Sequence, residues 1–299
     1  MIEQGKIAFI GLGVMGGPMA GHLLAAGRRL AVFNRTRSRA ESWLAAQGDL
    51  GRNATIVDTP ALAAKHAEVV ITCVGNDEDV REVTLGEGGA FSAIEPGALF
   101  IDHTTVSANM ARELCAAAES NGFLAVDAPV SGGQAGAVNG KLAIMCGGTE
   151  EAVERARPVM GAYGARIVHV GECGAGQTAK MANQMCIAGI LQGLSEAIRL
   201  TVAAGLDTDK VLEAISGGAA QSWQMENRWP TMVKDEFEFG FAVDWMRKDL
   251  GYALEEAGRL GLDSPVTAMV DEFYAEIQND GGGRLDTSSL IRRLPRGNT

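Results

Sequence analysis

The stretch that decides the fold is Lys6-Ile-Ala-Phe-Ile-Gly-Leu-Gly-Val-Met-Gly16. Its first five residues form a short apolar run of the kind that makes a buried parallel strand. The glycines that follow are spaced GxGxxG, and residues 18–26 carry helix-forming side chains that stop at Gly27. A strand, such a turn and a helix in this order predict a dinucleotide-binding turn. Its residues are Gly11, Leu12, Gly13, Val14, Met15 and Gly16.

Each glycine of this turn has its own expected role. Gly11 permits the tight turn, Gly13 lets the backbone approach a pyrophosphate, and Gly16 allows close packing of the helix on the strand. The start of the helix then offers unpaired N–H groups to the phosphates. The alternative is a glycine-rich turn without a ligand, which the strand before it and the helix after it argue against.

Apolar runs and helical stretches alternate from this turn to about residue 171. This alternation predicts an α/β fold with a Rossmann-type, doubly wound and mostly parallel sheet. Residues 175–204 lack proline and predict one long helix, and helical patterns continue to the C-terminus. We expect two domains: a cofactor-binding domain over 1–172, and an all-α domain for substrate binding and oligomerisation over 173–299. The predicted strands cover residues 6–10, 29–33, 69–74, 98–101, 123–126, 142–145 and 166–170.

The composition, with 46% apolar and 21% charged residues, is typical of a globular protein. A net charge of −11 argues against a general affinity for nucleic acid or anionic membranes. We find no signal peptide and no apolar run near the ~20 residues that cross a bilayer, so we expect a cytoplasmic protein. Scattered cysteines without CxxC pairs predict reduced thiols, and no metal-ligand spacing is present. The cysteines are Cys73, Cys115, Cys146, Cys173 and Cys186.

The second predicted strand is followed by Asn34-Arg-Thr-Arg37. An NAD site normally has Asp or Glu here, which binds the ribose 2′-hydroxyl, and this chain has neither. Arg35 can instead bind a 2′-phosphate through its planar guanidinium group. Asn34, Arg35 and Thr36 therefore predict NADP as the preferred cofactor, with NAD as the alternative. The competing interpretation is that Arg35 and Arg37 are solvated surface residues.

Lys180, Asn183 and Gln184 share one face of the predicted long helix. Hydride transfer to a carbonyl leaves an alkoxide, which a lysine ammonium can protonate; the neutral amine takes the proton back during oxidation. Small apolar neighbours argue against a surface lysine, so we predict Lys180 as the acid/base, and Asn183 as a residue that either orients the lysine or binds the substrate. The rival base is His103. Adjacent strand residues point to opposite faces, so Asp102 would not orient that histidine.

A second candidate segment, Asp127-Ala-Pro-Val-Ser-Gly-Gly133, follows a predicted strand. The Ser131 hydroxyl and the backbone N–H groups of Gly132 and Gly133 suit a small carboxylate, because several neutral donors can converge on one anion. The same composition is also typical of a plain turn. Lys248 lies in the second predicted domain, and on spacing alone it belongs to an ion pair on a helix surface.

Together these segments resemble the β-hydroxyacid dehydrogenase family, whose members include 3-hydroxyisobutyrate dehydrogenase, tartronate semialdehyde reductase and the glyoxylate/succinic semialdehyde reductases. Five segments match in order and span almost the whole chain, at residues 10–16, 127–133, 176–183, 248–250 and 281–286. One position departs from the usual family pattern, since His103 stands where Ser, Met or Gly is commoner.

The resemblance implies roles for individual residues and assembly as a homodimer or homotetramer through the helical domain. It implies that Lys180 is the catalytic acid/base and that Asn183 supports it. It places the substrate against Ser131, Gly132, Gly133, Phe241 and Asp249, and the cofactor against Val74, Gly75, Asn76, Thr105 and Lys248.

We therefore expect an oxidoreductase that interconverts a small 3-hydroxy acid, similar to 3-hydroxyisobutyrate, and its semialdehyde with NADP(H). Tartronate semialdehyde and glyoxylate/succinic semialdehyde reduction are the alternative reactions. An imine reductase on the same scaffold usually replaces the lysine, and a non-catalytic NADP-binding sensor would not need the lysine, serine and asparagine set. Lys180 therefore argues against both of these alternatives.

Overall fold

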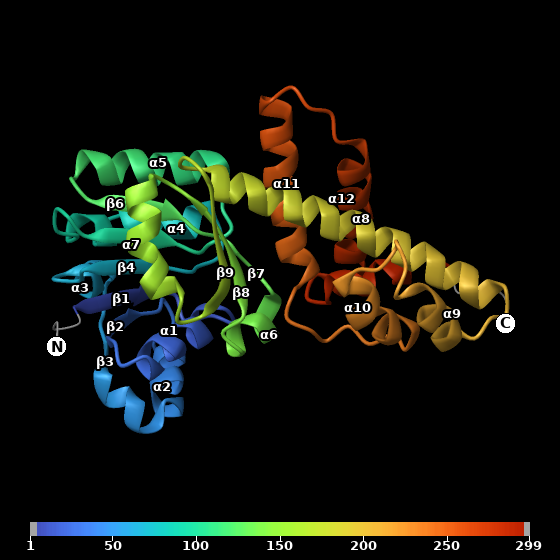
Figure 1. Ribbon diagram of the computed structural model, residues 1–299, viewed down its shortest axis with the longest axis horizontal. Coiled ribbons are helices and arrows are strands. Elements are labelled where there is room, and N and C mark those ends of the chain that lie inside the picture. The colour runs from blue at the N-terminus through green and yellow to red at the C-terminus, as the bar shows by residue number, and fades with distance from the viewer. Residues whose placement is uncertain (1–4, 296–299) are drawn as a thin grey trace. The chain divides into compact units, whose positions relative to one another are not determined.

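The computed structural model describes residues 5–295 and divides the chain into two compact units, Met1–Lys180 and Met181–Thr299. The first unit contains a nine-stranded sheet in the order β3-β2-β1-β4-β5-β6-β8-β7, with β9 paired to β8 (Figure 1). Strands β1 to β6 pair in parallel, whereas β8 runs antiparallel to β6 and β7. The predicted doubly wound, mostly parallel α/β fold is confirmed.

Side chains alternate between the two faces of this sheet, as the period of a strand requires. In β1, Ile7 and Phe9 join a core with the helices α1 and α7, whereas Ala8 and Ile10 join a core with α3, α4 and α5. Both faces are therefore buried, which explains why the strands have continuous apolar runs. The strands are β1 (Lys6–Ile10), β2 (Arg29–Phe33), β3 (Ala54–Ile56), β4 (Val69–Thr72), β5 (Leu99–Asp102), β6 (Leu124–Asp127), β7 (Val130–Ser131), β8 (Leu142–Gly147) and β9 (Gly164–Gly171).

Three short elements of the first unit were not predicted, namely β3, β7 and the helix α6. Each has two to six residues, too few for an apolar period to show in the sequence. The helices of this unit are α1 (Gly16–Ala25), α2 (Arg37–Ala46), α3 (Pro60–Ala64), α4 (Asp77–Leu85), α5 (Ala108–Ser120), α6 (Gly133–Val138) and α7 (Glu150–Met160), with 3₁₀ turns η1 (Gly48–Asn53) and η2 (Ala90–Ser92).

Helix α8 (Ala175–Ala203) begins in the first unit and continues into the second. It ends before Gly205, whose φ of +67° lets the chain leave the helix, and the predicted long helix is confirmed. The second unit packs α8 with other helices around the fully buried Trp229, so the predicted all-α fold is confirmed for its described residues. The remaining elements are α9 (Thr208–Ile215), α10 (Trp223–Val233), α11 (Val243–Arg259), α12 (Pro265–Ile277), η3 (Gln278–Gly282) and η4 (Thr287–Arg293).

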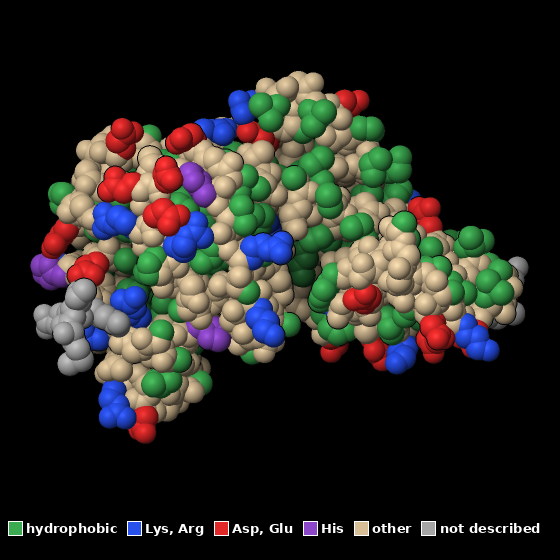
Figure 2. All heavy atoms as spheres, in the orientation of Figure 1, with side chains coloured by type: hydrophobic (Ala, Val, Ile, Leu, Met, Phe, Trp, Pro, Cys, Tyr) green, Lys and Arg blue, Asp and Glu red, His purple; other side chains and the backbone are tan. Residues whose placement is uncertain are grey.

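Helix α8 is more apolar than we expected from the sequence. An 18-residue window of it has a mean hydropathy of 1.3, so by length and composition it could cross a membrane; 33% of that window is buried inside the structure. Core helices of globular proteins pass the same test, and Leu191, Leu194 and Ile198 of α8 belong to the core of the second unit. On the face drawn in Figure 2, acidic and basic side chains are interspersed rather than gathered into one basic patch.

Candidate functional site

The glycine turn between β1 and α1 has the geometry that a dinucleotide requires. Gly11 has a φ of +100°, and a Cβ on it would collide with the carbonyl oxygen of Cys73. A Cβ on Gly16 would collide with the carbonyl oxygen of Gly11, so the start of α1 packs directly on the turn. A Cβ on Gly13 would meet nothing within 4 Å. The protein therefore leaves open space beside the Gly13 backbone, where the pyrophosphate is expected.

The start of α1 is also suited to an anion. No side chain caps this helix, and its first turn contains no acidic residue. By contrast, α4 is capped by the Asn76 side chain and has Asp77, Glu78 and Asp79 in its first turn. The first turn of α1 therefore keeps its positive dipole end unopposed, which favours a bound phosphate.

The loops after β1, β2, β4 and β5 meet at one edge of the sheet, because these neighbouring parallel strands end there. The Leu12 N–H donates to Asn34 Oδ1 at 3.0 Å, which joins the first two loops. The Val74 N–H donates to Thr104 Oγ1 at 3.0 Å, which joins the other two. The predicted cofactor-binding residues of the first unit lie in these loops, except Gly16, which is the first residue of α1: they are residues 11–16, 34–36, 74–76 and 105.

Arg35 extends from this edge into solvent, with 75% of its side chain exposed. Its Nη1 lies 2.8 Å from Asp79 Oδ1 of α4. Exposed ion pairs of this kind contribute about 0–1 kcal/mol, so the guanidinium can exchange Asp79 for a phosphate at little cost. Asn34 is held differently: it accepts from the Leu12 N–H and donates to the Thr36 carbonyl at 2.9 Å.

His103 is a core residue, although it was the rival base. Its Nδ1 donates to the Ala128 carbonyl at 2.6 Å, and its Nε2 accepts from the Tyr163 hydroxyl at 2.8 Å. Burial lowers the pKa of His103 from 6.5 to about 4, so the ring is neutral at pH 7. Asp102 points away from it, toward Thr72 and the Thr104 N–H, as the alternation of strand residues predicts. Burial raises the pKa of Asp102 to about 6.

Asp102 and His103 should each make the folding stability depend on pH, in opposite directions. The pKa of Asp102 rises from 3.8 to about 6, so its stabilising contribution is present below pH 3.8 and lost as the pH rises through 6. The pKa of His103 falls from 6.5 to about 4, so its contribution is present above pH 6.5 and lost as the pH falls toward 4. Each pKa shift corresponds to about 3 kcal/mol in the free energy of unfolding. The two contributions change with pH in opposite directions, so they nearly cancel in the wild type.

In an Asp102→Asn variant, the contribution of Asp102 is removed, so the pH dependence of stability caused by His103 should become measurable. The free energy of unfolding of this variant should fall by about 3 kcal/mol more than that of the wild type between pH 6.5 and 4. Urea unfolding across this pH range measures the difference. The exposed Asp49→Asn variant is the control and should follow the wild type, with its side chain 97% exposed. Identical pH profiles for Asp102→Asn and wild type would contradict the opposed pKa shifts.

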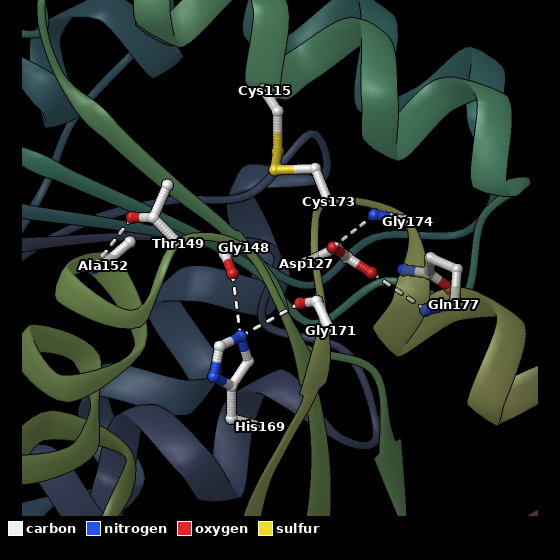
Figure 3. The surroundings of a disulfide bond; sticks show 10 residues. All are labelled: Cys115, Asp127, Gly148, Thr149, Ala152, His169, Gly171, Cys173, Gly174 and Gln177. Atoms are coloured by element: carbon white, nitrogen blue, oxygen red, sulfur yellow. Dashed lines mark hydrogen bonds between the residues drawn. A yellow bond between two sulfur atoms is a disulfide. The ribbon is translucent and has the colours of Figure 1, made fainter.

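The start of α8 is held by the buried carboxylate of Asp127, at the end of β6. Asp127 Oδ1 accepts from the Gly174 N–H at 2.8 Å, and Oδ2 accepts from the Gln177 N–H at 2.9 Å (Figure 3). Burial raises the pKa of Asp127, while these hydrogen bonds act in the opposite direction. Lys180 follows in the next turn and is only 8% exposed. The alternative of a solvated surface lysine is therefore wrong.

The predicted substrate segment is more regular than the loop that the sequence suggested. Ser131 ends β7, and Gly133 begins α6. Gly132 and Gly133 have φ values of +128° and +61°, which favour glycine, and both are exposed. Exposed backbone donors at the start of a helix, beside a hydroxyl, can bind a carboxylate.

In the second unit, two hydrogen bonds and one ion pair connect three of the predicted residues. Asn183 Nδ2 donates to Gln184 Oε1 at 2.8 Å, and Gln184 Nε2 donates to Asp249 Oδ2 at 2.7 Å. Lys248 Nζ lies 3.2 Å from Asp249 Oδ1, and its ammonium also lies over the Trp245 and Tyr252 rings. Asn183, Asp249 and Lys248 therefore belong to one network, whereas Phe241 packs against the core of this unit.

The prediction of reduced thiols is wrong for two of the five cysteines. Cys115 of α5 and Cys173, just before α8, form a disulfide with a Cα–Cα distance of 6.4 Å (Figure 3). The pairing was missed because 58 residues separate the two cysteines, and only the fold brings them together. Cys73, Cys146 and Cys186 remain thiols, and burial raises the pKa of Cys146 to about 12.

Two family models cover nearly the whole chain. The NAD binding domain of 6-phosphogluconate dehydrogenase matches residues 6–171, and the NAD-binding domain of NADP-dependent 3-hydroxyisobutyrate dehydrogenase matches residues 174–294. The chain belongs to the β-hydroxyacid dehydrogenase family. It is accordingly an NAD(P)-binding oxidoreductase, as the sequence analysis predicted.

Individual members of the β-hydroxyacid dehydrogenase family match over the same length. An oxidoreductase of Shewanella frigidimarina is 53% identical over 97% of this chain and 98% of its own. An NAD-dependent L-serine dehydrogenase of Pseudomonas aeruginosa is 37% identical over 97% of each chain. The structure of 3-hydroxyisobutyrate dehydrogenase from Mycobacterium tuberculosis with L-serine superposes with a TM-score of 0.88 and 35% identity, covering 97% of this chain and 99% of that one.

Two buried residues of this β-hydroxyacid dehydrogenase were given no role from the sequence. Asp127 was placed only as the first residue of the substrate segment, and Gln177 only as part of the segment before Lys180. Both bond to backbone groups that are distant in sequence, across 47 to 73 residues. Such partners leave no local pattern, so only the folded structure identifies them.

Proposed function

We propose that this protein interconverts a small 3-hydroxy acid and its semialdehyde with NADP(H), using Lys180 as the general acid/base. The observation that supports this most directly is the burial of Lys180 within the unit that also contains the glycine turn and Ser131. A lysine is seldom buried without a partner or a function, because its charge loses hydration.

In this proposal each residue has a separate task. The nicotinamide supplies or accepts the hydride when the cofactor is bound. Lys180 Nζ, as the neutral amine, takes the hydroxyl proton during oxidation, and as the ammonium it returns the proton during reduction. Ser131 and the N–H groups of Gly132 and Gly133 hold the substrate carboxylate, so that the carbon to be oxidised is oriented.

The hydroxy acid that serves as the substrate is to be identified by assay. Initial rates would be measured with 3-hydroxyisobutyrate, glycerate, 4-hydroxybutyrate, L-serine and the matching aldehydes, each with NADP(H) and NAD(H). L-serine is included because it is also a 3-hydroxy acid and a relative is named for its oxidation. We expect the highest kcat/KM with NADP(H) and a 3-hydroxy acid. Absence of turnover on every acid and aldehyde would contradict the proposal and favour an imine substrate or a non-catalytic role.

Arg35 should determine the preference for NADP. We expect Arg35→Ala to weaken NADPH binding by about 10- to 150-fold, because a hydrogen-bonded contact to a charged group contributes about 1.5–3 kcal/mol. NADH, without the 2′-phosphate, should bind as it does to the wild type. Fluorescence titration of both cofactors measures this. Arg52→Ala is the matched control, with 73% of that side chain exposed against 75% for Arg35. Equal loss of NADH and NADPH affinity would show that Arg35 does not recognise the phosphate.

A further inference from the structure

The Gln177 side chain is completely buried and uses both ends of its amide on one neighbouring loop. Its Nε2 donates to the Thr104 carbonyl at 2.8 Å, and its Oε1 accepts from the Val106 N–H at 3.1 Å. These two backbone groups flank Thr105, a predicted cofactor contact. The loop between β5 and α5 therefore takes its conformation from a side chain of α8.

Gln177 is itself fixed from the other side. Its backbone N–H donates to Asp127 Oδ2, the carboxylate that also accepts from the Gly174 N–H (Figure 3). The backbone of α8 packs closely against Asp127. A Cβ on Gly176 would lie 2.6 Å from the carbonyl oxygen of Asp127 and 2.8 Å from Asp127 Oδ2. The first turn of α8 is thus fixed against β6 by its backbone and against the Thr104–Val106 loop by one amide.

Lys180 lies three residues beyond Gln177, so the two side chains are neighbours along one face of α8. Any movement of the first helical turn relative to the Thr104–Val106 loop would move Lys180 with it, because no break separates these residues. We propose that Gln177 is a positioning residue, whose amide sets Lys180 relative to the cofactor loop that contains Thr105. This inference rests on the proposed acid/base role of Lys180.

Gln177→Met tests the inference, because it keeps the length of the side chain and removes both hydrogen bonds. We expect kcat to fall at least 10-fold with little change in the substrate KM, the pH profile of kcat to shift, and the Kd for NADPH to rise several-fold. Gln177→Glu should disturb the loop at least as much, since it keeps an acceptor for the Val106 N–H but places a buried carboxylate oxygen against the Thr104 carbonyl. Gln177→Leu, which removes the same two hydrogen bonds, provides the test if Gln177→Met does not fold.

Thr149→Ala is the matched control, because Thr149 caps α7 of the same unit by accepting from the Ala152 N–H at 3.2 Å (Figure 3). We expect it to lower the Tm and leave kcat, its pH profile and the NADPH Kd unchanged. If the Gln177 variants behave in the same way, the residue is merely structural and the inference is overturned. If instead a Lys180→Ala enzyme turns over normally, the proposed function fails, while the NADPH Kd still reports whether Gln177 orders the loop.

Discussion

A Lys180→Ala enzyme should turn over about 10²- to 10⁴-fold more slowly than the wild type, the range that one general acid/base contributes. Its Kd for NADPH should stay close to the wild-type value, because the glycine turn and the loops after β2, β4 and β5 are unchanged. Lys180→Arg should be nearly as slow, since a guanidinium keeps the positive charge but does not release its proton. Steady-state kinetics and fluorescence titration give the two quantities.

The control for Lys180 is Lys65→Ala, which removes an exposed lysine after α3 and should leave kcat unchanged. A Lys180→Ala enzyme with wild-type turnover would show that another group transfers the proton. Since both ring nitrogens of His103 are hydrogen-bonded in the core, that group would have to be sought elsewhere.

Reduction of the Cys115–Cys173 disulfide should lower the stability of the first unit by up to about 4 kcal/mol, the chain-entropy value for a closed loop of this length. We therefore expect a lower Tm in a dithiol reductant than in its absence. The Cys115→Ser/Cys173→Ser double variant should unfold at the temperature of the reduced wild type and show no response to the reductant. Cys186→Ser, which removes an exposed free thiol, is the control and should keep the full response.

Two results would contradict a stabilising Cys115–Cys173 disulfide. If the wild type shows the same Tm with and without the reductant, and mass spectrometry finds five free thiols in both, Cys115 and Cys173 are not joined in solution. If the bond is present but its loss leaves Tm unchanged, the Asp127 hydrogen bonds and the packing of α5 hold the start of α8 without it.

Local features of the fold were predictable from the sequence. The glycine turn, the apolar strands and α8 each have a recognisable pattern. The turn needs glycine at a positive φ, the strands are apolar because both faces of the sheet are buried, and α8 is a long run without proline. The very short elements β3, β7 and α6 were missed because two to six residues do not establish a period.

The site was only partly predictable. The burial of Lys180 was predictable, because small apolar neighbours are unusual around a surface lysine. Asp127, Gln177 and the disulfide act through partners 47 to 73 residues away, so no local pattern marks them. The Gln184–Asp249 hydrogen bond, which places Asn183 in a network, is of the same kind, with 65 residues between its partners.

The continuity of α8 also restricts how this chain can change length. One residue inserted between Lys180 and Asn183 would rotate the two side chains relative to each other by about 100°, because a helix has 3.6 residues per turn. An insertion into the loop after α8, at Gly205, would merely lengthen a connection. Descendants of this gene should therefore accumulate insertions and deletions in the surface loops while the number of residues between Gln177 and Gln184 stays constant.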